Sequence, residues 1–104
     1  MSATGVKQFY TEASATLKVL IGGVATEVGG VCYLKGVTIR PSGSTCHIKI
    51  YSGSSAVAAN LIYEQKCLDG EMYQEYIATE GVRSPDGMFI DLTTATSSVA
   101  VIWQ

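Results

Sequence analysis

The chain has 104 residues, 47% of them hydrophobic and 15% charged, which fits one domain and excludes intrinsic disorder. The net charge is −2 and no two of the seven Lys and Arg residues are adjacent, so we expect no nucleic acid as the main partner. No apolar run approaches the length of a membrane span, and no membrane partner is expected.

The first part of the chain predicts a short arm followed by a long strand. Residues 1–8 are polar and are expected to form a flexible N-terminal arm, with residues 9–104 as a single β-sandwich domain. In residues 9–21 the apolar side chains fall on one parity, the alternation of a half-buried strand. Glycine pairs at 22–23 and 29–30 predict hairpin turns on either side of a short strand.

The middle of the chain predicts two further strands. Residues 31–40 are apolar on both parities in their first half, as in a central strand. Gly36 interrupts them and predicts a bulge or the close approach of another backbone. Residues 45–51 alternate cleanly. Their inward set is Cys46, Ile48 and Ile50, and their outward set is Thr45, His47 and Lys49.

The remaining segments complete an all-β pattern. The one candidate for a helical turn is 56–60, and turn residues stand at Asp69-Gly70 and at 84–87. Further strands are expected at 61–67, 71–79, 88–92 and 99–103. Seven or eight strands joined by short connections predict a single-domain antiparallel β-sandwich or a jelly-roll-like barrel.

No residue pattern predicts catalysis. His47 is the only histidine, and its neighbour Cys46 points to the opposite face of the strand, so no nucleophile is held by a base. The cysteines Cys32, Cys46 and Cys67 lack the close pairs that zinc prefers. We interpret them as small buried hydrophobic residues.

Four acidic residues suggest a calcium site or a catalytic carboxylate pair as an alternative: Glu71, Glu75, Asp86 and Asp91. However, Asp86-Gly87 is explained as a turn and Asp91 as an outward strand residue, and the spacing of a calcium loop is absent. We therefore predict no enzyme activity, no cofactor and no metal.

The aromatic residues are the more informative set. The chain has six tyrosines and Trp103, and such residues are favoured in interfaces and in sugar sites. Tyr73 and Tyr76 lie on opposite parities, as do Phe9 and Tyr10, so some aromatic surface must be exposed. The alternative is a tyrosine that buries its ring and forms a hydrogen bond at the rim.

Several stretches resemble one kind of protein. These are VCYLKGVTIR at 31–40, IKIYSGSS at 48–55, GVRSPDGMFIDLTT at 81–94 and VAVIW at 99–103. Together they resemble the small β-sandwich structural proteins of tailed bacteriophages, which decorate capsids (cement proteins) or serve as other virion accessories. The resemblance implies a non-enzymatic, homo-oligomeric protein that binds the major capsid protein or another virion protein and stabilises the phage head.

The resemblance also implies a place in the virion and synthesis in the host bacterial cytoplasm. The first residues contain no charged segment followed by an apolar one, so we expect no secretory signal. Three widely spaced cysteines do not form a disulfide framework, which favours a reducing compartment. The alternative function is a carbohydrate- or receptor-binding module of a phage head or tail fibre. Exposed Tyr and Trp side chains gathered in one groove would favour that alternative.

Overall fold

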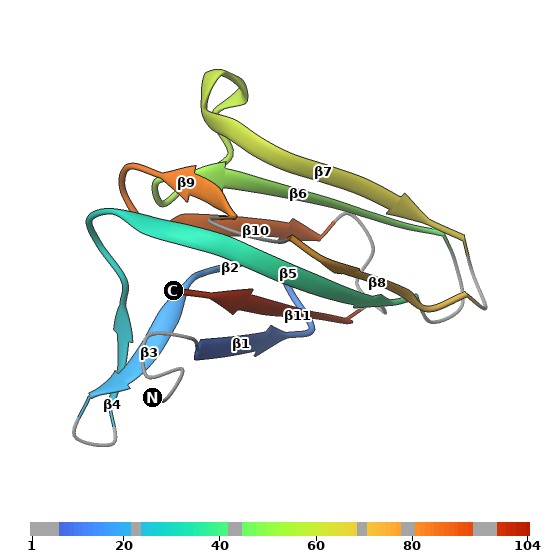
Figure 1. The fold of residues 1–104 in the computed structure, drawn as a ribbon, viewed down its shortest axis with the longest axis horizontal. Coiled ribbons are helices and arrows are strands. Elements are labelled where there is room, and N and C mark those ends of the chain that lie inside the picture. Colours follow the sequence, from blue (N-terminus) through green and yellow to red (C-terminus); the bar gives the residue numbers. More distant parts are fainter. Residues whose placement is uncertain (1–6, 22–23, 42–44, 69–70, 78–80, 93–97) are drawn as a thin grey trace.

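A computed structural model describes residues 7–21, 24–41, 45–68, 71–77, 81–92 and 98–104, which form two antiparallel sheets packed face to face (Figure 1). The five-stranded sheet contains, in order, β1 (Lys7–Thr11), β11 (Ser98–Trp103), β5 (Cys32–Arg40) and β8 (Tyr73–Tyr76), and β9 (Val82–Ser84) also pairs with β5. The four-stranded sheet contains, in order, β2 (Ala15–Thr16), β10 (Met88–Leu92), β6 (Cys46–Ser52) and β7 (Leu61–Cys67). A hairpin of β3 (Lys18–Ile21) and β4 (Val24–Glu27) extends from one end.

The strand order defines a jelly roll. If β1, β2, β5, β6, β7, β8, β10 and β11 are counted as the first to the eighth strand, one sheet has the order first, eighth, third, sixth. The other has the order second, seventh, fourth, fifth, which is the double Greek key of a jelly roll. The predicted all-β antiparallel fold is therefore confirmed. Within the described residues, no helix is long and apolar enough to cross a membrane.

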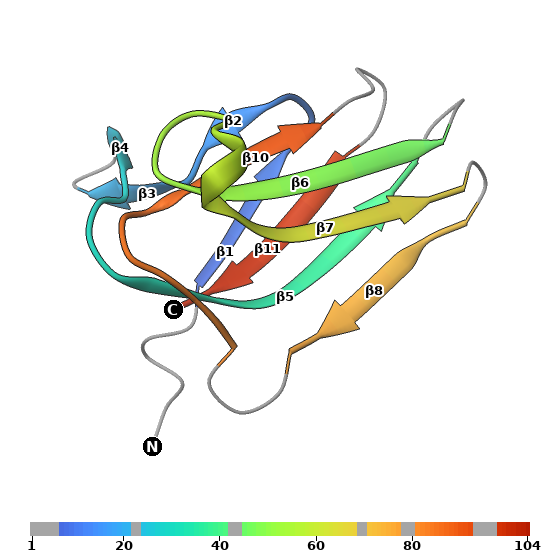
Figure 2. The ribbon, with the colours of Figure 1, turned by 90° about the horizontal axis from the view of Figure 1, so that it is seen from above.

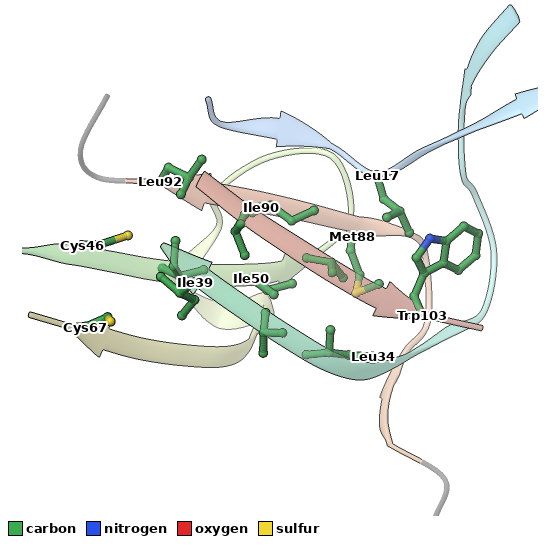
Figure 3. Close-up of a cluster of buried hydrophobic side chains, with 14 of the residues drawn as sticks. Leu17, Leu34, Ile39, Cys46, Ile50, Cys67, Met88, Ile90, Leu92 and Trp103 are labelled. Atoms are coloured by element: carbon green, nitrogen blue, oxygen red, sulfur yellow. The ribbon is translucent and has the colours of Figure 1, made fainter. Parts of the chain in front are cut away.

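The core lies between the two sheets, and both contribute to it (Figure 3). Leu34 and Ile39 point inward from β5, and Ile50 and Ile90 meet them from β6 and β10. Burying each such side chain contributes about 1.5–3 kcal/mol. The inward and outward sets predicted for residues 45–51 are confirmed, because Cys46, Ile48 and Ile50 are fully buried.

The predicted arm of residues 1–8 is too long, because its last two residues lie in a strand. Lys7 and Gln8 belong to β1 and pair with Trp103 and Ile102 of β11. The Lys7 ammonium also lies 5.2 Å from the centre of the Trp103 ring, a distance that permits a cation–π interaction. Residues 1–6 lie outside the described residues.

The single strand predicted over residues 9–21 is also wrong, because the chain turns and changes sheets within it. The Thr11 hydroxyl donates to the Ala13 carbonyl at 2.6 Å and accepts from the Ala13 N–H at 3.2 Å, which is a local side-chain turn. The Ser14 hydroxyl then accepts the Leu92 N–H at 2.9 Å. This bond fixes the start of β2 beside β10 in the other sheet.

Gly36 fulfils both parts of its prediction. The register of β5 against β11 shifts at this point, opposite Ile102 and Trp103. A Cβ on residue 36 would lie 3.0 Å from the Glu75 carbonyl oxygen of β8, which is closer than side chains normally approach. The glycine therefore lets β8 pair closely with β5.

The hairpin turn predicted at residues 29–30 is wrong. The strand before it, β4, pairs with β3 and not with β5. Gly30 instead joins the loop that precedes β10: its N–H donates to the Asp86 carboxylate at 3.0 Å, and its carbonyl accepts the Gly87 N–H at 2.8 Å. The other glycine pair lies between the paired strands β3 and β4 but outside the described residues.

The helical turn predicted at 56–60 is present as the short 3-10 helix η1 (Ala58–Asn60). Seen from above, the strands of the two sheets cross at an angle, and the loop that carries η1 lies over the four-stranded sheet (Figure 2). The turn predicted at 84–87 is confirmed, with Gly87 at a positive φ of 65°. The turn predicted at Asp69-Gly70 lies outside the described residues.

Candidate functional site

Eleven residues form a shallow, nearly uncharged surface on the outer side of the five-stranded sheet, and we call this surface the outer face. Strand pairing arranges ten of them in three rows across β1, β11, β5 and β8, and Met72, just before β8, lines the same hollow as Arg40. The first row is Gln8, Ile102, Gly36 and Tyr76; the second is Tyr10, Ala100, Thr38 and Gln74; the third is Ser98 and Arg40.

The alternation of each strand places these residues outside. In β11 the neighbours Val99, Val101 and Trp103 point into the core, so Ser98, Ala100 and Ile102 must point away from it. In β8, Tyr73 packs against the core while Gln74 and Tyr76 are exposed.

Exposed tyrosines stand on the two outermost strands of the outer face, and the small residues Ala100 and Thr38 lie at the centre of its middle row. Tyr10 on β1 is 54% exposed and Tyr76 on β8 is 69% exposed. Three strand spacings separate β1 from β8, a distance of about 14 Å. Between them, Ala100 and Thr38 leave a hollow of about 390 Å³. The hollow is lined by Gln8, Tyr10, Thr38, Arg40, Met72, Gln74, Ser98, Ala100 and Ile102.

The outer sides of the two sheets differ in charge. Arg40 is the one charged residue among the eleven of the outer face. The Glu12 carboxylate accepts the Tyr10 hydroxyl at 2.9 Å at its edge, and Arg83 pairs with Tyr33 of β5. On the outer side of the four-stranded sheet, Asp91, Lys49 and Glu64 lie side by side in one row, and His47 pairs with Lys66 in the next. This second surface therefore carries more charged side chains than the outer face.

His47 lies on the charged surface of the four-stranded sheet. Its Nε2 is 2.6 Å from the Glu64 carboxylate, and both side chains reach solvent. Cys46, its sequence neighbour, is fully buried on the other side of the strand, as predicted. The structure therefore does not bring these two residues together for chemistry.

The four acidic residues considered for a metal site or carboxylate pair hold separate positions. The Asp86 carboxylate accepts the Gly30 N–H, and the Asp91 carboxylate accepts the Ser14 hydroxyl at 3.0 Å. Glu75 binds two tyrosines, and the Glu71 carbonyl accepts the Cys67 thiol. Among the residues that the structure describes, no three His, Cys, Asp or Glu side chains are grouped to hold a metal ion.

Two tyrosines match the alternative expected from the sequence, in which the ring packs on the core and the hydroxyl forms a hydrogen bond at its edge. The hydroxyls of Tyr63 on β7 and Tyr73 on β8 both donate to Oε1 of Glu75 at 2.8 Å, so this cluster joins the two sheets. Burial and the hydrogen bond to Glu75 raise the pKa of Tyr63 above its ordinary value, and the hydrogen bond to Glu75 raises the pKa of Tyr73. Both hydroxyls stay protonated and act as donors.

The remaining candidates are core residues. Cys32, Cys46 and Cys67 are all free and buried, as predicted. Burial raises the pKa of the Cys32 thiol, so it is a poor nucleophile. Trp103 is only 5% exposed and belongs to the core, so the exposed aromatic surface consists of tyrosines.

The sequence predicted that Phe9 and Tyr10, and Tyr73 and Tyr76, could not all be buried, and the structure shows that Tyr10 and Tyr76 are the exposed members. The rest of the outer face was missed. The alternation of β11 was the available signal, because it places Ala100 and Ile102 opposite the buried valines. No family model matches the chain, and no curated protein or solved structure is significantly similar to it. The site is therefore defined by its geometry.

Proposed function

We propose that this protein is a non-enzymatic binding module that decorates the head of a tailed bacteriophage. It binds the capsid through the outer face and stabilises the shell. The observation that carries the proposal is the difference in charge between the two outer surfaces. A surface that is to be covered by protein loses its water, and charged side chains lose the most free energy in that step.

The composition of the outer face fits that role. Its exposed apolar area comes from Tyr10, Tyr76, Met72 and Ile102, and tyrosine and methionine are enriched where proteins meet. Ala100 at the centre lets a partner side chain approach the sheet closely, whereas Gly36 is buried beneath the Tyr76 and Ile102 side chains. Arg40, Glu12 and Arg83 around the edge supply the polar rim of such an interface.

The size of the outer face argues for repeated binding. Four strands by three rows cover roughly 400 Å², about half of the 800 Å² that each partner contributes to a standard interface. One copy is therefore expected to bind weakly. A homo-oligomer on a symmetric shell gains affinity because each further contact forms at a high effective concentration.

The alternative, a module that binds a carbohydrate or a receptor, is favoured by a separate observation. The hollow is bordered by Tyr10 and lined by amides and hydroxyls, including Gln8, Gln74 and Thr38. An aromatic ring can stack on the C–H face of a sugar, and amide and hydroxyl groups can bind its hydroxyls. Of the two exposed tyrosines, Tyr10 lines the hollow and Tyr76 does not, so one ring is available to stack on a sugar there.

The test uses particles of the phage that encodes the protein, prepared without it. Purified protein is added, and the bound fraction is measured by co-sedimentation. We expect wild-type protein to bind and Ala100→Glu to bind at least about tenfold more weakly, because it buries a charge. The matched controls are Ala100→Gln, which has the same size without the charge, and Thr45→Glu, which adds the charge on the other sheet. Equal binding by Ala100→Glu and wild type would exclude the outer face.

A further inference from the structure

Cys46 and Cys67 lie directly opposite each other in the core. Cys46 begins β6, Cys67 ends β7, and the two residues are register partners of this antiparallel pair. Both side chains point inward and are buried, with exposures of 0% and 4%. Figure 3 shows them side by side at one end of the core.

The backbone already has the spacing that a disulfide needs. Directly opposed residues of antiparallel strands have Cα atoms about 4.5–5.5 Å apart, and disulfides span Cα separations of about 4.4–6.8 Å. The thiols are close enough for Cys46 to contribute, after burial, to the raised pKa of Cys67. Cys32 is not part of this pair, because it lies on β5 of the other sheet opposite Ser84.

We propose that Cys46 and Cys67 are a site of reversible covalent modification, at which a cross-strand disulfide closes between their Sγ atoms. The oxidant is a low-molecular-weight disulfide such as glutathione disulfide. The Cys67 thiol loses its proton, and the thiolate attacks the oxidant to form a mixed disulfide and release one glutathione thiolate. The Cys46 thiol then loses its proton, and its thiolate attacks the Cys67 sulfur and displaces the second glutathione.

Cys67 is the residue that reacts first. It ends β7, which is an edge strand of the four-stranded sheet, and edge strands open more readily than central ones. Its thiol donates to the Glu71 carbonyl at 3.1 Å, and this hydrogen bond must break before the sulfur turns toward Cys46. Because burial raises the pKa of this thiol, the reaction is slow at neutral pH.

The bond would attach the edge strand β7 covalently to β6. It closes the loop between residues 46 and 67, which removes conformations from the unfolded chain and raises the melting temperature by roughly 5–15 °C. This inference does not depend on the proposed function, because it concerns the isolated protein.

The test incubates the folded full chain with glutathione disulfide for hours at pH 8, blocks free thiols and measures intact mass and a peptide map. We expect wild type and Cys32→Ala to lose two hydrogen atoms and to yield one cross-linked peptide joining residues 46 and 67. Cys46→Ala and Cys67→Ala should not form this product. Circular dichroism checks that each variant is folded. If a variant is unfolded, the peptide map of the wild-type protein alone shows whether residues 46 and 67 are joined.

Two results would overturn the inference. One is a folded wild-type protein that keeps all three thiols although a small exposed thiol control is fully oxidised. The other is a product in which Cys32 is the bonded partner, or in which glutathione stays attached to a single cysteine without closing the ring.

Discussion

Tyr10 and Tyr76 face the same side of the five-stranded sheet from its two outermost strands, with Ala100 and Thr38 between them. Nothing in the local sequence relates the two tyrosines, and only the order β1-β11-β5-β8 brings them to one surface. This relationship defines the outer face.

Substituting Tyr10 or Tyr76 by alanine tests the glycan-binding alternative to the capsid-decoration function. Tyr10→Ala and Tyr76→Ala should change the free energy of unfolding by less than about 0.5 kcal/mol, because both side chains are exposed. If the partner is a glycan, screening on a glycan array should find binding by wild type that Tyr10→Ala loses. Array binding that survives both substitutions would place any glycan site elsewhere.

Salt dependence reports the nature of the interface. The outer face has one charged residue, Arg40, among its eleven, so few ion pairs are available for salt to screen. We expect the affinity for particles to change less than about twofold between 0.1 and 1 M sodium chloride. A loss of an order of magnitude or more would show that charges outside the outer face supply the binding.

The cluster around Glu75 predicts a pH effect on stability. Because the folded state raises the pKa of Tyr63, its contribution is complete below the unfolded pKa of about 10 and is lost as the pH rises further. Tyr63→Phe should be less stable than wild type by about 1 kcal/mol at pH 8. Above pH 10 the gap should narrow by up to about 1 kcal/mol per pH unit. Urea unfolding at pH 8 and pH 11 measures both values, and a constant gap would mean that Tyr63 ionises equally in both states.

Gly87 tests the packing of the loop that leads into β10. Its φ is 65°, and a Cβ there would lie 2.2 Å from the Val28 carbonyl oxygen. Gly87→Ala should therefore cost more than about 3 kcal/mol of unfolding free energy, from backbone strain and the clash together. Gly53 is the matched control, because it also has a positive φ, of 103°, but a Cβ there would meet no atom within 4 Å. Gly53→Ala should cost about 1–2 kcal/mol, and equal losses would mean that the clash relaxes freely.

Local patterns predicted the strands well because alternation is a local property. The inward set of β6 and the irregularity at Gly36 could both be predicted from neighbouring residues. The break after Thr11 could not. The alternation continues through it to the buried Leu17, and the bond that holds the new direction joins Ser14 to Leu92, far along the chain.

The candidate site was harder to predict for the same reason. Parity indicates that the aromatic pairs Phe9/Tyr10 and Tyr73/Tyr76 cannot all be buried, but a shared face depends on which strands pair. That pairing is decided by long-range contacts of the jelly roll, such as β11 between β1 and β5. The charged surface of the other sheet became informative only when the rows of β10, β6 and β7 were aligned.

The most direct test of the central claim is thermal rupture of the phage particle. Particles lacking the protein are heated alone, with wild-type protein, and with Ala100→Glu, and DNA release is followed with a dye. Because a ligand that binds the assembled shell stabilises it by mass action, wild-type protein should raise the rupture temperature and Ala100→Glu should leave it unchanged. If the rupture temperature is the same in all three samples while particles lacking the protein have lost adsorption to cells, the decoration function is wrong and the receptor-binding alternative replaces it.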